Sequence, residues 1–190
     1  ILKLLTMYQE QIMKTLMILA MALLASPSWG YKQEDLDKLA ATNTCQECDL
    51  AGADLHLAYL REANLTKANL TKANLEKAIL TKANLAGADL RGTVLGVAFL
   101  PLADLREADL ERVDLSHASL RGANLTGANL TGANLEKADL AGADLAGADL
   151  RGTVLTGAVL RDAKIDFADF TKAKFCNTVM PDGQRIFKDC

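Results

Sequence analysis

A leucine stands at every fifth position of this chain from Leu50 to Leu160 without interruption. Larger apolar residues continue the series at the same spacing: Ile165, Phe170 and Phe175. The residue two positions earlier is nearly always alanine, and the residue between the two is usually Asp or Asn. A period of five fits neither the α-helix nor a simple strand. The chain must therefore turn after each unit for the leucines to face one axis, which predicts a coil with flat faces.

Glycine marks the corners of this coil. Every glycine from Gly52 to Gly157 except Gly96 is the second residue after a central leucine, which we call the corner position. A type II turn needs positive φ at one position, and glycine adopts it without steric cost. Pro101 directly follows a central leucine, where its fixed φ suits a turn. Some units carry lysine at the corner position and predict a different turn there: Lys67, Lys72, Lys77 and Lys82.

The Ala-Asp/Asn-Leu triplet followed by two variable residues resembles the signature of the pentapeptide repeat family. The resemblance covers Cys48 to Phe175. It implies an all-β fold, a right-handed quadrilateral β-helix with four units per coil, in which Leu and Ala point inward and Asp or Asn outward. At a strand spacing of roughly 4.8 Å, the rod would be on the order of 30 Å long.

Three bulkier residues replace the inward alanine on a single face of this coil: Thr93, Val113 and Thr153. Their numbers differ by multiples of 20, so four units per coil would stack them in one column. We expect this face to accommodate the extra bulk. The two threonine hydroxyls should hydrogen-bond to local backbone, because a buried hydroxyl without a partner is costly.

The amino-terminal segment has the parts of a secretory signal peptide. Lys14 follows Met13, an apolar run extends from Leu16 to Ala25, and small residues lead to Gly30. The run is shorter than the roughly 20 residues that span a bilayer. We expect residues 1–30 to be an upstream extension and signal peptide, with Met13 as the true start and cleavage after Ser28 or Gly30. A buried amphipathic helix is the alternative.

The flanks of the repeat array are expected to cap the ends of the coil. Residues 31–47 form the amino-terminal cap, with a helix from Glu34 to Ala41, and residues 176–190 form a carboxyl-terminal capping loop. One face of the helix is apolar: Leu36, Leu39 and Ala40. The tail resembles the terminal segment of exported pentapeptide proteins of cyanobacteria and of thylakoid lumen relatives. The β-helix itself should span residues 48–175.

Four cysteines in an exported chain indicate disulfides. We favour a bridge between Cys176 and Cys190. Cys45 and Cys48 fall in inward positions of the first unit, where they either bridge or remain small buried apolar residues. A zinc site would need four ligands, and the second cysteine pair should lie a rod's length away, so we expect no metal.

Composition and charge reveal no catalytic constellation. The chain is 50% hydrophobic and 5% aromatic, with a formal net charge of −3, or 19 − 23 = −4 without residues 1–30. His56 and His117 fall three coils apart, so they cannot join in one site with a nucleophile and an acid. The repeated aspartates read as solvated outward residues. We therefore expect no enzyme activity, no catalytic or cofactor-binding residues and no cofactor.

The polar surface is interrupted on one face. Outward positions Tyr59, Ile79 and Phe99 are spaced by 20 and should stack in one column. Apolar residues also fall beside this column: Leu57, Val97, Pro101 and Leu102. Such patches usually mark docking sites. Either residues 31–44 fold over this patch, or it binds a partner or a second copy.

The sequence favours a non-enzymatic exported scaffold of the periplasm, thylakoid lumen or extracellular space, with an unknown protein partner. The alternative is a DNA-mimicking modulator of a topoisomerase such as gyrase, a class the resemblance also contains. That class has strongly acidic faces, whereas here Lys and Arg are interspersed and no insertion interrupts the frame from Leu50 to Phe175. We expect no nucleic-acid partner and no membrane span in the mature chain.

Overall fold

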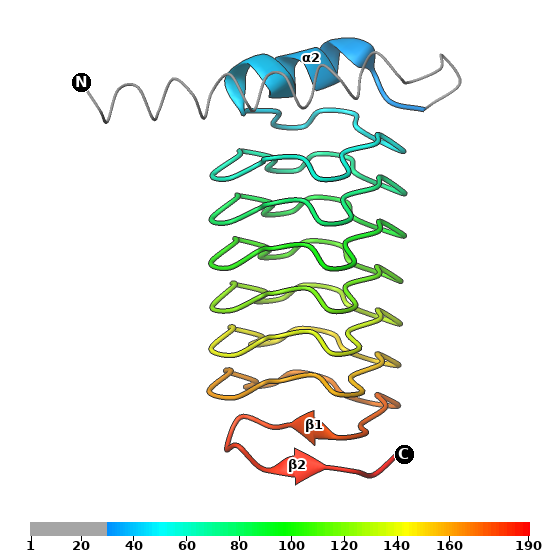
Figure 1. Cartoon of the computed structure of the whole chain (residues 1–190), viewed down its shortest axis with the longest axis vertical. Coiled ribbons are helices and arrows are strands. Elements are labelled where there is room, and N and C mark those ends of the chain that lie inside the picture. Colours follow the sequence, from blue (N-terminus) through cyan, green and yellow to red (C-terminus); the bar gives the residue numbers. More distant parts are fainter. Residues whose placement is uncertain (1–29) are drawn as a thin grey trace, which may run out of the picture.

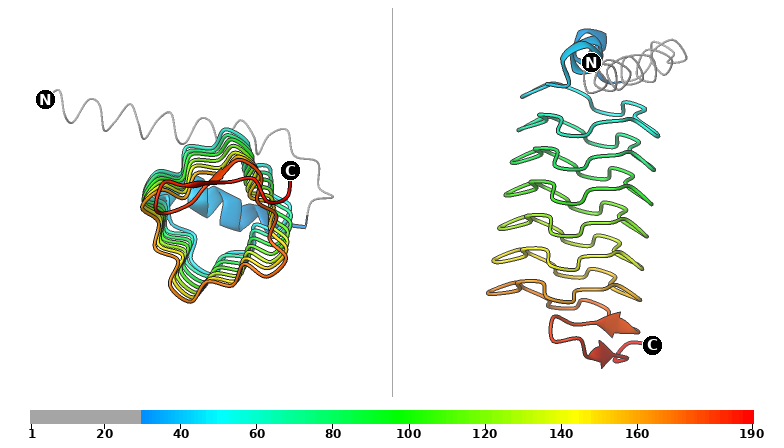
Figure 2. Two further views of the ribbon diagram at one scale, coloured as in Figure 1. Left: turned by 90° about the horizontal axis from the view of Figure 1, so that it is seen from below. Right: turned by 60° about the vertical axis from the view of Figure 1, so that its left-hand side comes forward.

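The chain winds into a stack of flat, four-sided coils. The computed structural model describes residues 30–190, and Figures 1 and 2 show the coils seen from the side and along their axis. Bridges between coils join residues 20 apart in parallel register, such as Asn64 with Asn84 and Asp104 with Asn124. Twenty residues per coil correspond to four units of five, so the predicted number of units per coil is confirmed.

We number the four faces by their central residues in one coil: Leu50 for face 1, Leu55 for face 2, Leu60 for face 3 and Leu65 for face 4. The central leucines from 50 to 160 and the alanines two positions before them are buried. The residue between these two positions lies on the outside and is only partly buried in most units. The interior is therefore packed by the periodic Leu and Ala, as predicted.

The expectation that lysine corners use a different turn is wrong. Lys72 has a φ of 57° and Gly52 a φ of 71°, both in the left-handed region. In both units the amide after the corner donates to the central carbonyl, at 3.0 Å for Ala73 to Leu70. The corner amide also donates to the next coil, at 3.0 Å from Lys72 to Arg91. Bonds between coils thus hold non-glycine corners in a conformation that they rarely adopt alone.

The column of bulkier inward residues is buried, but one of its hydroxyl bonds differs from expectation. Thr153 Oγ1 donates to the carbonyl of Leu150 at 2.8 Å, which is the expected local bond. Thr93 Oγ1 instead donates to the carbonyl of Leu70, 23 residues away, at 2.7 Å. The preceding coil supplies this acceptor.

A helix lies across the amino-terminal end of the coil (Figure 1). Helix α2 spans Gln33–Thr42, and it ends at Asn43, which has a left-handed φ of 55°. Its buried residues are Leu36, Leu39 and Ala40, as predicted. The carboxylate of Asp35 accepts a hydrogen bond from the amide of Asp49 at 2.8 Å. The helix is therefore attached to the first coil by both apolar packing and a polar contact.

A small hairpin follows the last coil. Strand β1 spans Thr178–Val179 and strand β2 spans Arg185–Ile186, and the two pair antiparallel. Two disulfides are present, one near each end. Cys45 and Cys48 are bridged with a Cα–Cα distance of 5.3 Å, which settles the open alternative for this pair. The predicted bridge between Cys176 and Cys190 is confirmed, with a Cα–Cα distance of 4.9 Å.

The predicted signal peptide, with cleavage expected after Ser28 or Gly30, lies outside the described residues except for Gly30. Within residues 30–190, no helix has the length and apolar character needed to cross a bilayer.

Leu85→Ala should destabilise the fold by about 3 kcal/mol, because it deletes a fully buried side chain from a closely packed interior. Urea unfolding measures the change. Thr81→Ala, on the outside of the preceding unit, is the control and should change the unfolding free energy by less than about 0.5 kcal/mol. Equal effects of the two substitutions would contradict an inward-facing leucine column.

Candidate interaction surface

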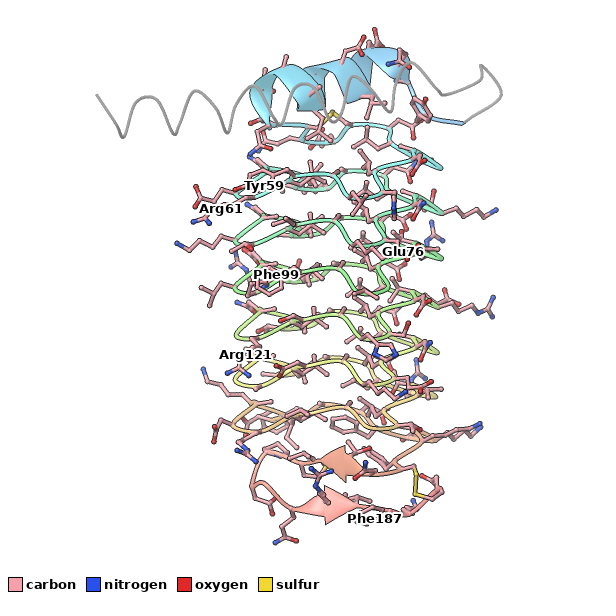
Figure 3. The ribbon with its side chains drawn as sticks, viewed as in Figure 1. Tyr59, Arg61, Glu76, Phe99, Arg121 and Phe187 are labelled. Carbon is pink, nitrogen blue, oxygen red and sulfur yellow. A yellow bond between two sulfur atoms is a disulfide. The ribbon has the colours of Figure 1, made fainter. Side chains whose placement is uncertain are left out.

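Three apolar residues stack on the outside of face 3. Bridges join Tyr59 to Ile79 and Ile79 to Phe99, so the three occupy adjacent coils. Figure 3 shows Tyr59 and Phe99 above one another on the same part of the rod. Phe99 is 48% exposed, and the other two are half-buried. The column predicted from the 20-residue spacing is therefore present.

The two corners that border face 3 add further exposed apolar side chains. Leu57 and Val97 occupy the corner before this face and are 45% and 53% exposed. Leu102 occupies the corner after it and is 57% exposed, next to the half-buried Pro101. We call the combined surface the apolar patch: Leu57, Tyr59, Ile79, Val97, Phe99, Pro101 and Leu102.

Three residues of the apolar patch are also conformationally strained. Leu57, Val97 and Leu102 have φ values of 60°, 58° and 59°. Bulky and β-branched residues rarely adopt this region, and it costs them roughly 1–2 kcal/mol. Glycine occupies the same corner position in many other units without this cost. The sequence therefore accepts two unfavourable features at these corners, backbone strain and apolar exposure.

The alternative that residues 31–44 fold over the apolar patch is wrong. Helix α2 lies across the open end of the coil, and its apolar residues are buried there, not on face 3 (Figure 3). The apolar residues of the helix join the core cluster that contains the inward residues of the first coil, such as Cys45 and Leu50. The patch thus stays exposed within the described part of the chain.

Paired charges surround the apolar patch. Lys77 contacts Glu76 at 3.0 Å, Arg61 contacts Glu62 at 3.6 Å, and Arg121 contacts Asp139 at 3.0 Å. Both signs are present around an apolar centre. This arrangement matches the anatomy of protein interfaces, which have an apolar core and a polar rim.

Elsewhere, arginines neutralise the outward aspartates. Arg91 Nε donates to Asp89 Oδ1 at 2.9 Å, and its guanidinium also lies 3.5 Å from Asp109 of the next coil. The hydrogen bond from Arg91 lowers the pKa of the Asp89 carboxyl, against a smaller opposing effect of burial. Equivalent arginines lower the pKa of Asp104 and Asp149. The aspartate columns are therefore not continuous tracks of uncompensated negative charge.

Within residues 30–190, neither His56 nor the group of Asp35, Cys45 and Cys48 forms a catalytic or metal-binding site. His56 Nδ1 lies 4.0 Å from Glu76 Oε2 and has no nucleophile beside it in the frame. Ligand atoms of Asp35, Cys45 and Cys48 lie within 4.8 Å of one another. Both sulfurs are, however, joined in a disulfide, so neither is available as a thiolate ligand.

The fold agrees with comparisons against known proteins. The family model described as pentapeptide repeats matches eight copies, at residues 44–76, 58–96, 103–142 and 138–177. These matches cover more than half of the chain. The chain belongs to the pentapeptide repeat family. Membership of this family carries the right-handed quadrilateral β-helix that the repeat predicts, and the coils and corners described above fit it.

Several solved structures resemble this pentapeptide repeat protein. HetL, involved in heterocyst differentiation regulation in the cyanobacterium Nostoc sp. strain PCC 7120, is 38% identical over 75% of this chain and 72% of that chain, with a TM-score of 0.39. A trypsin-treated form of QnrB1, a plasmid-mediated fluoroquinolone resistance protein, is 25% identical over 73% and 72%, with a TM-score of 0.61. A pentapeptide repeat protein from the Arabidopsis thaliana thylakoid lumen is 34% identical over 40% and 59%, with a TM-score of 0.27. A comparison with curated protein sequences gave no match.

The sequence analysis missed three exposed apolar residues: Val94, Phe167 and Phe187. Phe167, at a corner of the last coil, is 97% exposed and has a φ of 59°. The signal was present in the five-residue frame, since Phe167 is the second residue after Ile165 and therefore occupies a corner position.

Arg91→Ala should raise the pKa of Asp89 toward the ordinary aspartate value, because the main cause of its lowering is removed. Carboxyl NMR titration measures the change. Since the folded pKa is lowered, the pair stabilises the fold above the unfolded pKa, and that contribution is lost as pH falls through the folded pKa. Arg112→Ala, whose nearest carboxylate is Glu111 at 3.5 Å, is the control and should leave Asp89 unchanged.

Proposed function

We propose that this pentapeptide repeat protein is a non-enzymatic scaffold that binds a protein partner through the apolar patch on face 3. The observation that carries the proposal is the coincidence of strain and exposure at Leu57, Val97 and Leu102. A glycine at each of these corners would remove both costs. Apolar side chains that the fold itself does not need are best explained by a partner that buries them.

The physical properties of the rod suit such a role. Adjacent coils are joined by backbone hydrogen bonds of 2.7–3.1 Å on every face, so the patch is held in one arrangement before a partner arrives. A surface that is ordered in advance loses little conformational entropy on binding. Phe99 lies between the exposed Val97 and Leu102 along the chain and is the natural anchor, because aromatic residues are among those that contribute most to interface affinity.

The flanking segments serve this scaffold as caps. Residues 31–47 cover the amino-terminal end through helix α2, and residues 176–190 cover part of the other end. An uncovered β-helix end invites addition of further strands, so caps keep the rod, residues 48–175, at a fixed length. A disulfide lies in each flank: Cys45 is bridged to Cys48 at the start of the rod, and the bridge between Cys176 and Cys190 closes the carboxyl-terminal loop.

The working location is an oxidising compartment: the periplasm, the thylakoid lumen or the extracellular space. Two disulfides support it, since such bonds persist mainly outside reducing compartments. Residues 1–30, with their short apolar run, are the export signal and are removed.

A DNA-mimicking modulator of gyrase is the second candidate function. The similarity in fold to QnrB1 supports it. One feature disfavours it. Arg91, Arg106 and Arg151 neutralise the aspartates beside them, which removes the continuous negative track that would imitate phosphates. Inhibition of gyrase supercoiling by the purified protein would favour this candidate over the scaffold.

Val97→Gly combined with Leu102→Gly should weaken partner binding at least about ten-fold, because two exposed contacts are removed. The same change should stabilise the fold, since the strain at both corners is relieved. A photo-crosslinking amino acid in place of Phe99 reports binding in the compartment, and thermal unfolding reports stability. Lys72→Gly, at a corner of face 1, is the control and should keep the adduct. An adduct of unchanged yield in the double variant would contradict the proposal.

The mature protein should begin at Trp29 or Tyr31, because small residues precede each cleavage site. Expression of the full chain from Met13 in a bacterium, followed by mass spectrometry of the periplasmic product, measures this boundary. A product that keeps the apolar run and stays in the cytoplasm would support a buried helix instead of a signal peptide.

A further inference from the structure

The two ends of the rod are covered to different extents. At the amino-terminal end, Cys45, Leu50 and Leu55 are fully buried beneath helix α2. In the last coil, the equivalent inward residues are only partly buried: Ile165, Ala168, Phe170 and Phe175. The view along the axis in Figure 2 shows that the final segment crosses only part of the last coil.

The hairpin covers faces 2 and 3 of the last coil. Strand β2 pairs with β1 on face 3. On face 2, the amide of Asp189 donates to the carbonyl of Phe175 at 2.8 Å, and Cys190 is bridged to Cys176. No equivalent contacts within residues 30–190 reach faces 4 and 1 of this coil. We call this uncovered part, residues 163–172, the open edge.

The open edge has more hydrogen-bond donors than acceptors. One coil higher, the amides of Leu145 and Gly147 donate to the next coil at 2.8 Å each, and those of Leu150 and Gly152 do so at 2.8 and 2.9 Å. In the last coil the corresponding amides have no partner within the described chain: Ile165, Phe167, Phe170 and Lys172. Two carbonyls that would accept from a following coil, those of Ala163 and Ala168, are equally unpaired there. The open edge thus offers four donors and two acceptors.

Phe167 projects toward the space below the open edge. Corner side chains in this rod extend over the corner of the following coil: a Cβ placed on Gly157 would lie 3.1 Å from Lys137 Cγ, and one on Gly122 would lie 2.9 Å from Leu102 Cδ2. Within residues 30–190, no coil follows Phe167 on this face, and its side chain is 97% exposed. Its ring is therefore positioned to pack on a residue that this part of the chain does not supply.

An apolar cavity adjoins the open edge. It has a volume of about 410 Å³ and lies between face 4 and the hairpin. Its lining consists of Ile165, Met180, Pro181, Asp182, Gln184 and Ile186. A side chain that extended inward from a strand below face 4 would meet this cavity and Ile165 at once.

We propose that the open edge binds an extended polypeptide segment as an additional half-coil, in the parallel register of the rod. Strand addition to an exposed edge is a common mode of peptide recognition, in which the backbone supplies affinity and side-chain pockets supply specificity. The four amides of the open edge donate hydrogen bonds to carbonyls of the segment, and its two free carbonyls accept hydrogen bonds from amides of the segment. An apolar residue of the segment covers Ile165 and Phe170, and a glycine at its turn accommodates the Phe167 ring.

A second copy joined end to end fits the open edge less well. A twofold axis would bring two identical edges together, each with two donors for every acceptor. Half of the donors would then remain without a partner at the interface, where an unpaired polar group is costly. A parallel segment presents the complementary set, because each coil of the rod pairs with the next in that way. The occupant favoured here is therefore a segment with the five-residue pattern, not another open edge.

A synthetic peptide with the sequence of residues 143–152, Ala-Asp-Leu-Ala-Gly-Ala-Asp-Leu-Arg-Gly, is a suitable probe, because those residues occupy faces 4 and 1 in the rod. Fluorescence anisotropy of the labelled peptide against the whole, disulfide-bonded chain should show saturable binding. The same peptide N-methylated at both aspartates lacks the amides that would donate to Ala163 and Ala168. It should bind about ten-fold more weakly.

Two protein variants separate the open edge from general stability. Phe167→Gly removes the projecting ring and relieves a positive φ, so it should weaken peptide binding about five-fold while the melting temperature stays equal or rises. Lys72→Gly makes the same backbone change at a corner of face 1 far from this end, and it should leave peptide affinity unchanged.

Equal affinity of the parent and N-methylated peptides would overturn the proposal, as would the absence of saturable binding or an unchanged affinity of Phe167→Gly. Analytical ultracentrifugation supplies the remaining outcome. A concentration-dependent dimer that Phe167→Gly dissociates would identify a second copy as the occupant and would equally overturn the proposal of a peptide. The apolar patch on face 3 takes no part in either measurement, so its function is tested separately.

Discussion

The hydrogen bonds between successive coils are the constraint on which the rest of this structure depends. Each face repeats the same two donations to the coil below, such as Leu65 to Asn84 and Lys67 to Ala86, at 2.7 and 2.9 Å. No unit can adopt its own preferred turn without breaking this ladder. Non-glycine corners therefore share the left-handed conformation of glycine, and inward leucines stack at a fixed interval.

The same ladder explains why surface residues carry the functional information. Backbone and core are nearly identical from coil to coil, so differences between coils lie in outward and corner side chains. Val97, Leu102 and Phe167 are exposed and strained although the ladder would accept glycine at each corner. The arginines beside Asp89 and Asp104 make the surface less distinctive instead, because they neutralise negative charge that would otherwise dominate two faces. A rigid rod with local exceptions is what a binding scaffold requires.

The ends follow from the ladder as well, because every coil must be covered by another coil or by something that imitates one. Helix α2 covers the first coil by burying Leu36 and Leu39 against its inward residues. The hairpin imitates a coil on only two faces of the last one, through the β1–β2 pair and the contact of Asp189 with Phe175. The hairpin covers less of the last coil than helix α2 covers of the first. The backbone amides of Ile165 and Phe170 therefore have no hydrogen-bond partner within residues 30–190.

The five-residue spacing alone determined the period and the inward leucines. Together with the resemblance to pentapeptide repeat proteins, it also predicted the four faces and the stacking of Tyr59 with Phe99. The bridge between Cys176 and Cys190 was predicted from the presence of four cysteines in a chain expected to be exported. Only the tertiary structure decided that lysine corners turn as glycine corners do, that Thr93 bonds to Leu70 in another coil, and that the last coil is half covered. These features depend on backbone partners about 20 residues away, and local preference at a residue contains no information about such a partner until the coil has closed.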